Sequence, residues 1–475
     1  MQKIVFHKPF MGVQPCEIEF DRFLLLIGEQ ASGKSTIAKL IYFFQNILMQ
    51  DAARFCVKKE NKKLDEIAFN SKFLSSIAHV FQETFGFGLK NIDISFYYNT
   101  ENTNEQVINL HHNEEHRLDA VCSFTDDIFQ KKGGTTNQFL PKSISSLFPD
   151  SDLYSFMTDI DEKLSVNIDN NLFIIAGRSS TVTYSEFFEK EFYANIKLSI
   201  QKKQHNKQSC IDEILMLQFL QRVIDIKEYI DIFNDYLQSN ELNEDEAKEE
   251  LELFSHYIDT YEERGEDDAE QGYNYSPRLD IPLMEKAIKS ILKASYKLED
   301  DKEYLTVDNA QVPLSQTSSG QQEALRILQD IQEVIEKRKE PASRIIEEPE
   351  AHLYPTAQKE IVNLLALMLN ANDKNTLIIT THSPYILACV NILLMANDVS
   401  KETKVGDKIV SDIIAKEFWL DSKMFNAYSL GNTEVYCKNI KDEETGMIDQ
   451  NYLDLISVQL GLQYEQLFNL LLHNA

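Results

Sequence analysis

Short apolar runs recur along the chain with the length of strands buried inside a sheet. Phe23–Ile27, Leu172–Ala176 and Thr376–Thr380 are unbroken or nearly unbroken runs of this kind, and Ser343–Ile346 is a shorter one. Such runs are typical of parallel strands that are covered on both faces. Amphipathic segments lie between them, so the pattern predicts a parallel α/β sheet.

The predicted helices carry apolar residues at the spacing of one helical face. Ile211–Leu237 is the longest, with apolar positions three and four residues apart along most of its length. The other predicted helices are Ile37–Phe44, Phe55–Lys63, Leu74–Phe85, Glu323–Arg338 and Thr356–Asn370.

A second group of strands has the pattern of an antiparallel sheet. Ile18 and Phe20 alternate with acidic residues, and Ile92–Tyr98 and Gln106–Leu110 have strand-like composition. Gly133–Asn137 has the composition of a loop. Further strands are expected at Tyr304–Val307 and Val312–Leu314.

The chain changes character between residues 183 and 285. Residues 241–270 carry fourteen acidic and two basic side chains, interleaved with apolar positions, as in an acidic amphipathic helix. We therefore expect three parts: an N-terminal lobe at 1–182, a helical, coiled-coil-like insertion at 183–285 and a C-terminal lobe at 286–475.

Composition restricts the setting of the protein. The chain has 475 residues, enough for about three domains, and a net charge of −29, which argues against a protein that coats nucleic acid by bulk attraction. Its six cysteines form no C-x-x-C pair, as expected of free thiols in a reducing compartment. The N-terminus has no signal-peptide pattern and no apolar run approaches 18 residues. These features favour a cytoplasmic protein.

A phosphate-binding loop follows the first buried run. Gly28–Thr36 matches G-x-x-x-x-G-K-[ST] between a strand and a helix, as this motif requires. Its glycines allow backbone N–H groups to point at an anion, Lys34 can reach the β- and γ-phosphates, and the Ser35 hydroxyl can bind Mg²⁺. The residues predicted to bind the nucleotide are Gly28, Gln30, Ala31, Ser32, Gly33, Lys34, Ser35 and Thr36.

Two carboxylates end the strand within Ile345–Leu353, in the arrangement of a Walker B motif. Glu347 is predicted to hold Mg²⁺ and Glu348 to act as the general base that activates water. His382 follows Thr376–Thr380, at the edge where parallel sheets bind ligands.

A serine–glycine turn precedes the helix predicted from Glu323. Read alone, such a turn is more often a helix cap than a ligand site. The turn consists of Ser318, Ser319, Gly320 and Gln321.

Together these segments resemble an ABC-type ATPase head of the RecF/SMC/OLD-like branch, within the AAA ATPases. The turn resembles the signature loop of that family, with Ser319 in place of the usual first glycine, and Glu347 stands where the family usually has aspartate. The resemblance implies a two-lobed P-loop fold, ATP and Mg²⁺ as ligands, ATP hydrolysis, and His382 as the residue that senses the γ-phosphate. It also implies a homodimer in which the signature loop of one copy meets the ATP of the other. Ala351–Pro355 resembles the loop that carries signals across that dimer.

The chain also resembles the stand-alone ATPases of bacterial anti-phage systems, such as the PtuA and AriA families. This resemblance implies a regulatory ATPase that controls a separate nuclease or toxin subunit. The chain ends 93 residues after His382, so we expect no nuclease domain of the kind that OLD-like proteins append.

Two other functions remain open from the sequence. A DNA-repair or chromosome-maintenance ATPase would bind duplex DNA, and a scaffold would bind ATP with little turnover. The lysines available for DNA are Lys58, Lys59, Lys62, Lys63, Lys202, Lys203 and Lys207.

Two further features have alternative interpretations. Arg178 lies where ABC ATPases place a loop glutamine, and either a phosphate contact or an ordinary surface position fits it. His112–His116 matches the zinc-protease pattern H-x-x-E-H, but it follows a strand-like segment, so we expect a solvated turn.

Overall fold

The computed structural model describes most of both predicted lobes and part of the helical insertion. The described residues are 1–51, 66–100, 106–123, 164, 166, 170–179, 211–239, 280–299, 302–308, 310–401, 406–431 and 435–449, without the side chains of 66–71 and 231–239. Several predicted features therefore lie outside the described residues. They are the helix Phe55–Lys63, the loop Gly133–Asn137, the acidic stretch 241–270 and the seven candidate DNA-binding lysines.

A six-stranded sheet forms the centre of the molecule, in the order β14-β13-β3-β12-β11-β7. Its strands are β3 (Phe23–Gly28), β7 (Asn171–Ile174), β11 (Ser343–Glu347), β12 (Thr376–Thr381), β13 (Phe425–Leu430) and β14 (Cys437–Asn439). All pairs are parallel except β13 with β14. The four predicted strands of this sheet are confirmed, and both lobes contribute to it.

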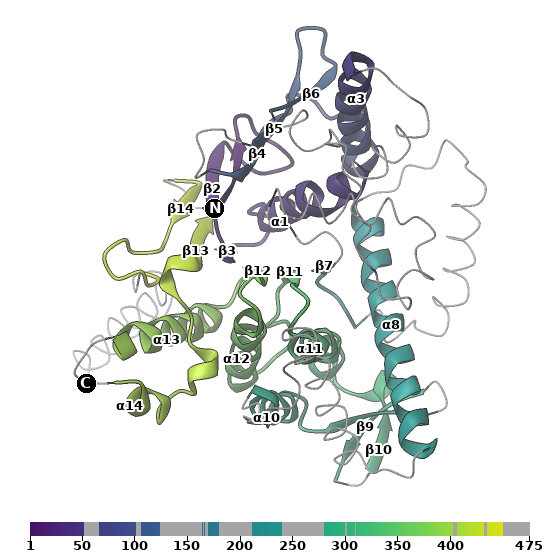
Figure 1. The fold of residues 1–475 in the computed structure, drawn as a ribbon, viewed down its shortest axis with the longest axis vertical. Coiled ribbons are helices and arrows are strands. Elements are labelled where there is room, and N and C mark those ends of the chain that lie inside the picture. Colours follow the sequence, from purple (N-terminus) through teal and green to yellow (C-terminus); the bar gives the residue numbers. More distant parts are fainter. Residues whose placement is uncertain are drawn as a thin grey trace, which may run out of the picture.

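Helices cover both faces of this sheet, which explains why the inner strands β3 and β11 are largely apolar (Figure 1). In Figure 1, α1 lies on one side of β11 and β12, and α11, α12 and α13 lie on the other. These helices are α1 (Lys34–Tyr42), continued by the π-helix η1 (Phe43–Ile47), α11 (Ser319–Glu336), α12 (Pro355–Ala371) and α13 (Pro384–Lys401). The expected α/β class with flanking helices is thus confirmed.

An antiparallel sheet with the order β2-β1-β4-β5-β6 stands beside the phosphate loop. It contains β1 (Gln2–Phe6), β2 (Cys16–Phe20), β4 (Asp93–Asn99), β5 (Gln106–His112) and β6 (Leu118–Cys122), and α3 (Glu66–Phe85) packs on β6. Phe44, in the turn after α1, stacks on Phe96 of β4 with ring centroids 4.9 Å apart. The antiparallel sheet is therefore packed directly against the helix that begins at the phosphate loop.

The remaining elements lie outside these two sheets, and several of their helices contact α11, α12 or α13. They are α8 (Ile211–Ser239), α10 (Asp280–Leu292), β8 (Ser295–Glu299), β9 (Lys302–Val307), β10 (Ala310–Pro313), η3 (Leu314–Gln316), α14 (Asp407–Ser411), η4 (Lys416–Phe418) and η5 (Ser422–Met424). Arg222 of α8 contacts Asp330 of α11 at 2.8 Å, and Asp330 also pairs with Arg344 of β11 at 2.6 Å. This network of ion pairs attaches α8 to α11.

Among the described helices, none is long and apolar enough to cross a membrane.

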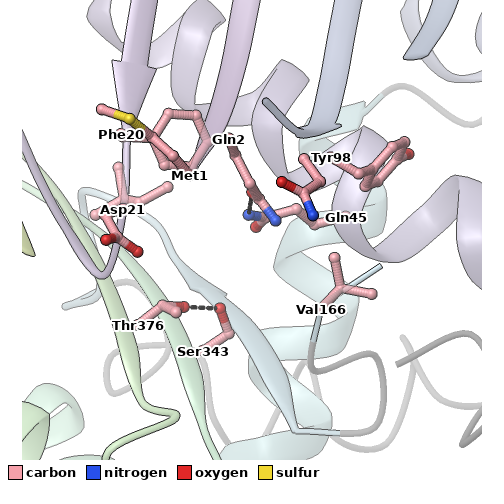
Figure 2. A pocket seen from close by; sticks show the side chains of 11 residues that line it. Met1, Gln2, Phe20, Asp21, Gln45, Tyr98, Val166, Ser343 and Thr376 are labelled. Atoms are coloured by element: carbon pink, nitrogen blue, oxygen red, sulfur yellow. Dashed lines mark hydrogen bonds between the residues drawn. The ribbon is translucent and has the colours of Figure 1, made fainter. Parts of the chain in front are cut away.

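A cavity of about 200 Å³ opens at the amino ends of the parallel strands. Figure 2 shows Ser343 and Thr376, the first residues of β11 and β12, on one wall and Gln2 and Gln45 on another. The phosphate loop follows the carboxyl end of β3, so this cavity lies at the opposite edge of the sheet.

Candidate active site

The phosphate loop is left-handed at Gly33, one of its two glycines, and at Ala31. Gly33 has φ of 89° and caps α1, and Ala31 also has a positive φ of 60°. A Cβ at Gly33 would lie 2.6 Å from the hydroxyl of Tyr436, which donates a hydrogen bond to the Ser32 carbonyl at 2.7 Å. Tyr436 thus supports the loop from the C-terminal lobe, a contact that the sequence did not indicate.

Lys34 is the buried cation of this loop. Its ammonium donates to the carbonyls of Gly28 and Glu29 at 2.7 and 2.8 Å and to the Ser32 hydroxyl at 3.3 Å. Burial lowers the pKa of Lys34, and the nearby carboxylates Glu348, Glu350 and Glu347 act in the opposite direction. The structure therefore brings the loop lysine and the predicted catalytic acids into one site.

The other loop residues surround this cation. Gln30, Ala31 and Ser35 are exposed, Ser32 is buried, and the Thr36 hydroxyl lies 3.5 Å from the Met11 carbonyl. The exposed Ser35 hydroxyl at the start of α1 is open to a ligand, as the Mg²⁺ prediction requires.

Glu347 ends β11 with its carboxylate buried. Oε2 accepts a hydrogen bond from the Ala176 backbone N–H at 3.2 Å, whereas Oε1 has no partner within the described part of the chain. An orphaned carboxylate oxygen at this edge fits a divalent cation. The described residues hold no cluster of three or more metal-ligating side chains. Mg²⁺ commonly uses only one or two carboxylates together with phosphate oxygens, so the donor set of Glu347 and Ser35 fits that ion.

Glu348 follows directly, and its backbone is left-handed. Its φ is 44°, a conformation that costs about 1–3 kcal/mol for a residue with a side chain and that often marks functional sites. Its N–H donates to the Thr380 carbonyl at 2.8 Å, and its Oε1 lies 3.1 Å from Nε2 of His382. The predicted general base and the predicted γ-phosphate sensor are therefore in contact.

His382 is held by an acid to which the sequence gave no role. Oε1 of Glu350 accepts hydrogen bonds from the His382 backbone N–H at 2.8 Å and from the Thr381 hydroxyl at 2.6 Å. Glu350 is buried, and its Oε2 also lacks a partner within the described residues. Glu350 thus fixes the end of β12 against the loop after β11.

The serine–glycine turn caps α11, and its two serines are exposed. Ser318 and Gln321 form a reciprocal capping box at the start of α11, and Gln321 also donates to the Leu292 carbonyl at 2.8 Å. Ser318 and Ser319 are exposed. A Cβ at Gly320 would lie only 2.6 Å from the carbonyl oxygen of His352, so the turn touches the loop after β11.

The structure corrects the interpretation of Arg178 as a surface residue. Its side chain is fully buried, so it is not a surface arginine. Its guanidinium donates to main-chain carbonyls, including those of Glu347 at 2.7 Å and Glu348 at 3.0 Å, and it pairs with Glu323. These contacts hold the guanidinium within the protein, against the main chain of the two Walker B acids.

The zinc-protease pattern lies in a β-hairpin. His112 ends β5, its Nδ1 accepts a hydrogen bond from the Ile92 N–H at 3.0 Å, and the following residues form an exposed turn. No cluster of three or more metal-ligating side chains lies here within the described part of the chain. The expected solvated turn is confirmed.

Comparison with known proteins adds a family and a set of similar folds. The AAA ATPase domain model matches residues 8–387, which include all four motif segments, and no curated protein matches the chain significantly. A Pyrococcus furiosus Smc head domain with an extended coiled coil, bound to the C-terminal domain of ScpA, is 14% identical with a TM-score of 0.33, covering 82% of this chain and 92% of that one.

Two further solved structures show similarity of the same order. A SmcHead bound to the C-winged helix domain of ScpA is 12% identical with a TM-score of 0.38, covering 94% of this chain and 98% of that one. The SMC head domain from Thermotoga maritima is 10% identical with a TM-score of 0.34, covering 93% and 98%. Similarity at this level carries no information about function.

Proposed function

Because the chain belongs to the AAA ATPase domain family, we propose that it binds ATP with Mg²⁺ and hydrolyses it to ADP and phosphate. The observation that carries this proposal is the contact between Glu348 and His382, 3.1 Å apart at the edge that also holds Lys34. A carboxylate beside an imidazole and a buried ammonium suits attack by water on a terminal phosphate.

Each residue has a separate task in this mechanism. The N–H groups of the Gly28–Thr36 loop and the N-terminus of α1 bind the phosphates, with Lys34 on the β- and γ-oxygens. Glu348 accepts a proton from the attacking water, and His382 orients Glu348 and donates to the γ-phosphate. Ser35 and Glu347 would hold Mg²⁺, which supplies charge neutralisation at the phosphates.

We further propose that two copies enclose two ATP molecules, as in ABC-type heads. The exposed turn at Ser318 and Ser319 then presents the N-terminus of α11 to the γ-phosphate bound by the other copy. Tyr354 and Tyr385 support such a contact, because they follow the catalytic loops and are 76% and 53% exposed. Tyrosine is enriched at protein interfaces. The contact is isologous, since each copy supplies both surfaces.

A mixture of two inactive variants tests the shared site. Lys34→Ala removes the cation of the phosphate loop, and Ser318→Arg places a bulky cation on the turn. In a mixed dimer both lesions fall on one composite site and the other site is intact. Activity above the sum of the separate variants supports the proposal. If mass measurements show that mixed dimers form but their activity does not exceed that sum, the result counts against a shared site unless hydrolysis requires two intact sites at once.

The biological role that we propose is control of a separate nuclease or toxin in a bacterial defence complex. The resemblance of the motifs to stand-alone defence ATPases supports this role. We also propose that the chain has three parts, an N-terminal lobe at 1–182, a helical insertion at 183–285 and a C-terminal lobe at 286–475. Identifying a stoichiometric partner that co-purifies from the native host tests this role. A DNA-binding ATPase is the alternative, and a steeply salt-dependent affinity for duplex DNA would favour it.

A further inference from the structure

We infer that Arg178 is a positioning residue for Glu348 and that Glu323, near the start of α11, anchors it there. The inference rests on the proposed ATP hydrolysis, in which Glu348 is the general base. It gives Arg178 a function different from the two interpretations that the sequence allowed.

The guanidinium of Arg178 binds the carbonyls of two successive peptides, one before and one after the Cα of Glu348. Nη1 donates to the Glu347 carbonyl at 2.7 Å, and Nη2 donates to the Glu348 carbonyl at 3.0 Å. Nη1 also reaches the Ile175 carbonyl at 2.7 Å, at the end of the neighbouring strand β7. One rigid, planar group thus holds the ends of β7 and β11 in a fixed relation.

These hydrogen bonds act on a residue whose backbone is unfavourable by itself. Glu348 has φ of 44°, and its N–H is bound to the Thr380 carbonyl at 2.8 Å while its carbonyl is bound to Arg178. Fixing both polar groups of the residue maintains the left-handed turn that directs its carboxylate to His382. Without Arg178, Glu348 is free to relax toward ordinary backbone angles, and its carboxylate leaves this position.

Glu323 connects Arg178 to the helix that carries the serine–glycine turn. Its Oε2 accepts from the Arg178 N–H at 2.9 Å and lies 3.2 Å from Nε, and its Oε1 accepts from the Ser179 N–H at 3.1 Å. Glu323 lies in the second turn of α11 and is 2% exposed. A displacement of α11, as when its N-terminus meets a ligand, is therefore transmitted through one buried pair to the general base.

The test replaces both members of the pair, because removal of one leaves a buried unpaired charge that can unfold the protein. In Arg178→Met with Glu323→Gln we expect ATP affinity and KM to stay within about threefold of the wild type, while kcat falls by about 100-fold. Arg178→Lys is the conservative second variant. It keeps a charge beside Glu323 but cannot donate in a planar fork to two carbonyls, so the same split is expected.

The matched control is an equally buried pair on the same helix. Arg326 of α11 binds Glu303 of β9 at 2.6 Å, away from Glu348. Arg326→Met with Glu303→Gln should keep kcat within about threefold of the wild type, since it changes only packing and charge. A second comparison adds the Arg178 and Glu323 changes to Glu348→Gln, where they should cause no further loss of kcat because the residue they position is already inactive.

Several results would overturn the inference. They are an unchanged kcat in both Arg178 variants, a parallel loss of ATP affinity and kcat, or a further large loss in the Glu348→Gln background. A wild-type protein that binds ATP but does not hydrolyse it refutes the proposed function itself, and that result is distinct from these. Loss of kcat in the control pair equal to that in the Arg178 pair assigns the effect to general destabilisation and also overturns the inference.

Discussion

Gly320→Ala is the smallest change that tests whether the serine–glycine turn must stay in contact with the loop after β11 during catalysis. An added Cβ would lie 2.6 Å from the His352 carbonyl oxygen, and ordinary contacts begin at 3.4 Å. The turn and the loop after β11 must therefore separate by about 0.8 Å, and neither side is a flexible side-chain end that can rotate away. His352 follows Glu348 by four residues and has φ of 59°, so its loop has little freedom to adjust.

The expected effects on stability and on catalysis differ. Alanine favours a helix over glycine by up to about 1 kcal/mol, which offsets part of the clash in the free energy of unfolding. A displacement near 1 Å at a catalytic loop can cost about 100-fold in rate, so we expect kcat for ATP to fall by about 10- to 100-fold. ATP affinity should change little, since the Gly28–Thr36 loop is not touched.

The assay compares steady-state ATP turnover, binding of a fluorescent ATP analogue and thermal unfolding of each variant. Gly88→Ala is the matched control, because Gly88 has φ of 89° but no atom within 4 Å of an added Cβ. It should lower stability by about 1 kcal/mol through its backbone and leave turnover unchanged. Full turnover in a folded Gly320→Ala protein would refute the reasoning that the turn and the loop must stay in contact during catalysis.

Three other predictions concern the site, and a fourth concerns the buried ion pair of Glu303 outside it. Lys34→Ala should abolish ATP binding measured by titration, because it removes the cation of the phosphate loop. Glu348→Gln should bind ATP normally and hydrolyse it about 10²- to 10⁴-fold more slowly; the opposite outcome, with Glu347→Gln sparing binding and stopping turnover, would exchange the roles of the two acids. His382→Ala should lower kcat by about tenfold or more, because it removes the group that contacts Glu348 and donates to the γ-phosphate, while the Gly28–Thr36 loop retains most of the ATP affinity. Burial alone would raise the pKa of Glu303, but Arg326 and Lys227 lower it from 4.5 to about 2. The free energy of unfolding should therefore decrease by up to about 3 kcal/mol as the pH falls from 4.5 to 2, measured by unfolding at a series of acid pH values. The decrease should be smaller in Glu303→Gln.

The sequence was most informative where one local pattern determines the structure. The strands β3, β11 and β12 are apolar on both faces because helices cover both, and this leaves a signal that needs no knowledge of distant residues. The phosphate loop is equally local, since Gly33 must be left-handed at the start of α1. Helices such as α3 and α12 were predicted for the same reason, from spacing alone.

The sequence was uninformative where a role depends on a partner far along the chain. Arg178 and Glu323 are separated by 145 positions, and Tyr436 and Ser32 by 404, so no spacing reveals either contact. Glu350 had no predicted role because its task, holding the end of β12, exists only once the sheet has formed. The strand β13 carries polar residues within its buried positions, including Asn426, and so lacked the unbroken apolar pattern of its neighbours.

The order of the central sheet explains why these distant residues form one site. The carboxyl ends of parallel strands lie at the same edge of a sheet, and neighbouring strands are about 4.8 Å apart. The strand order β3, β12, β11, β7 therefore determines the order of the functional groups along that edge. The phosphate loop follows β3, His382 follows β12, Glu348 follows β11 and Arg178 follows β7. The loop and the general base are thus two strand spacings apart, about 10 Å, a distance that a triphosphate and an attacking water can occupy, with His382 between them. Arg178 comes one spacing further out, beyond the reach of that substrate, where it can act on Glu348 only through the main chain.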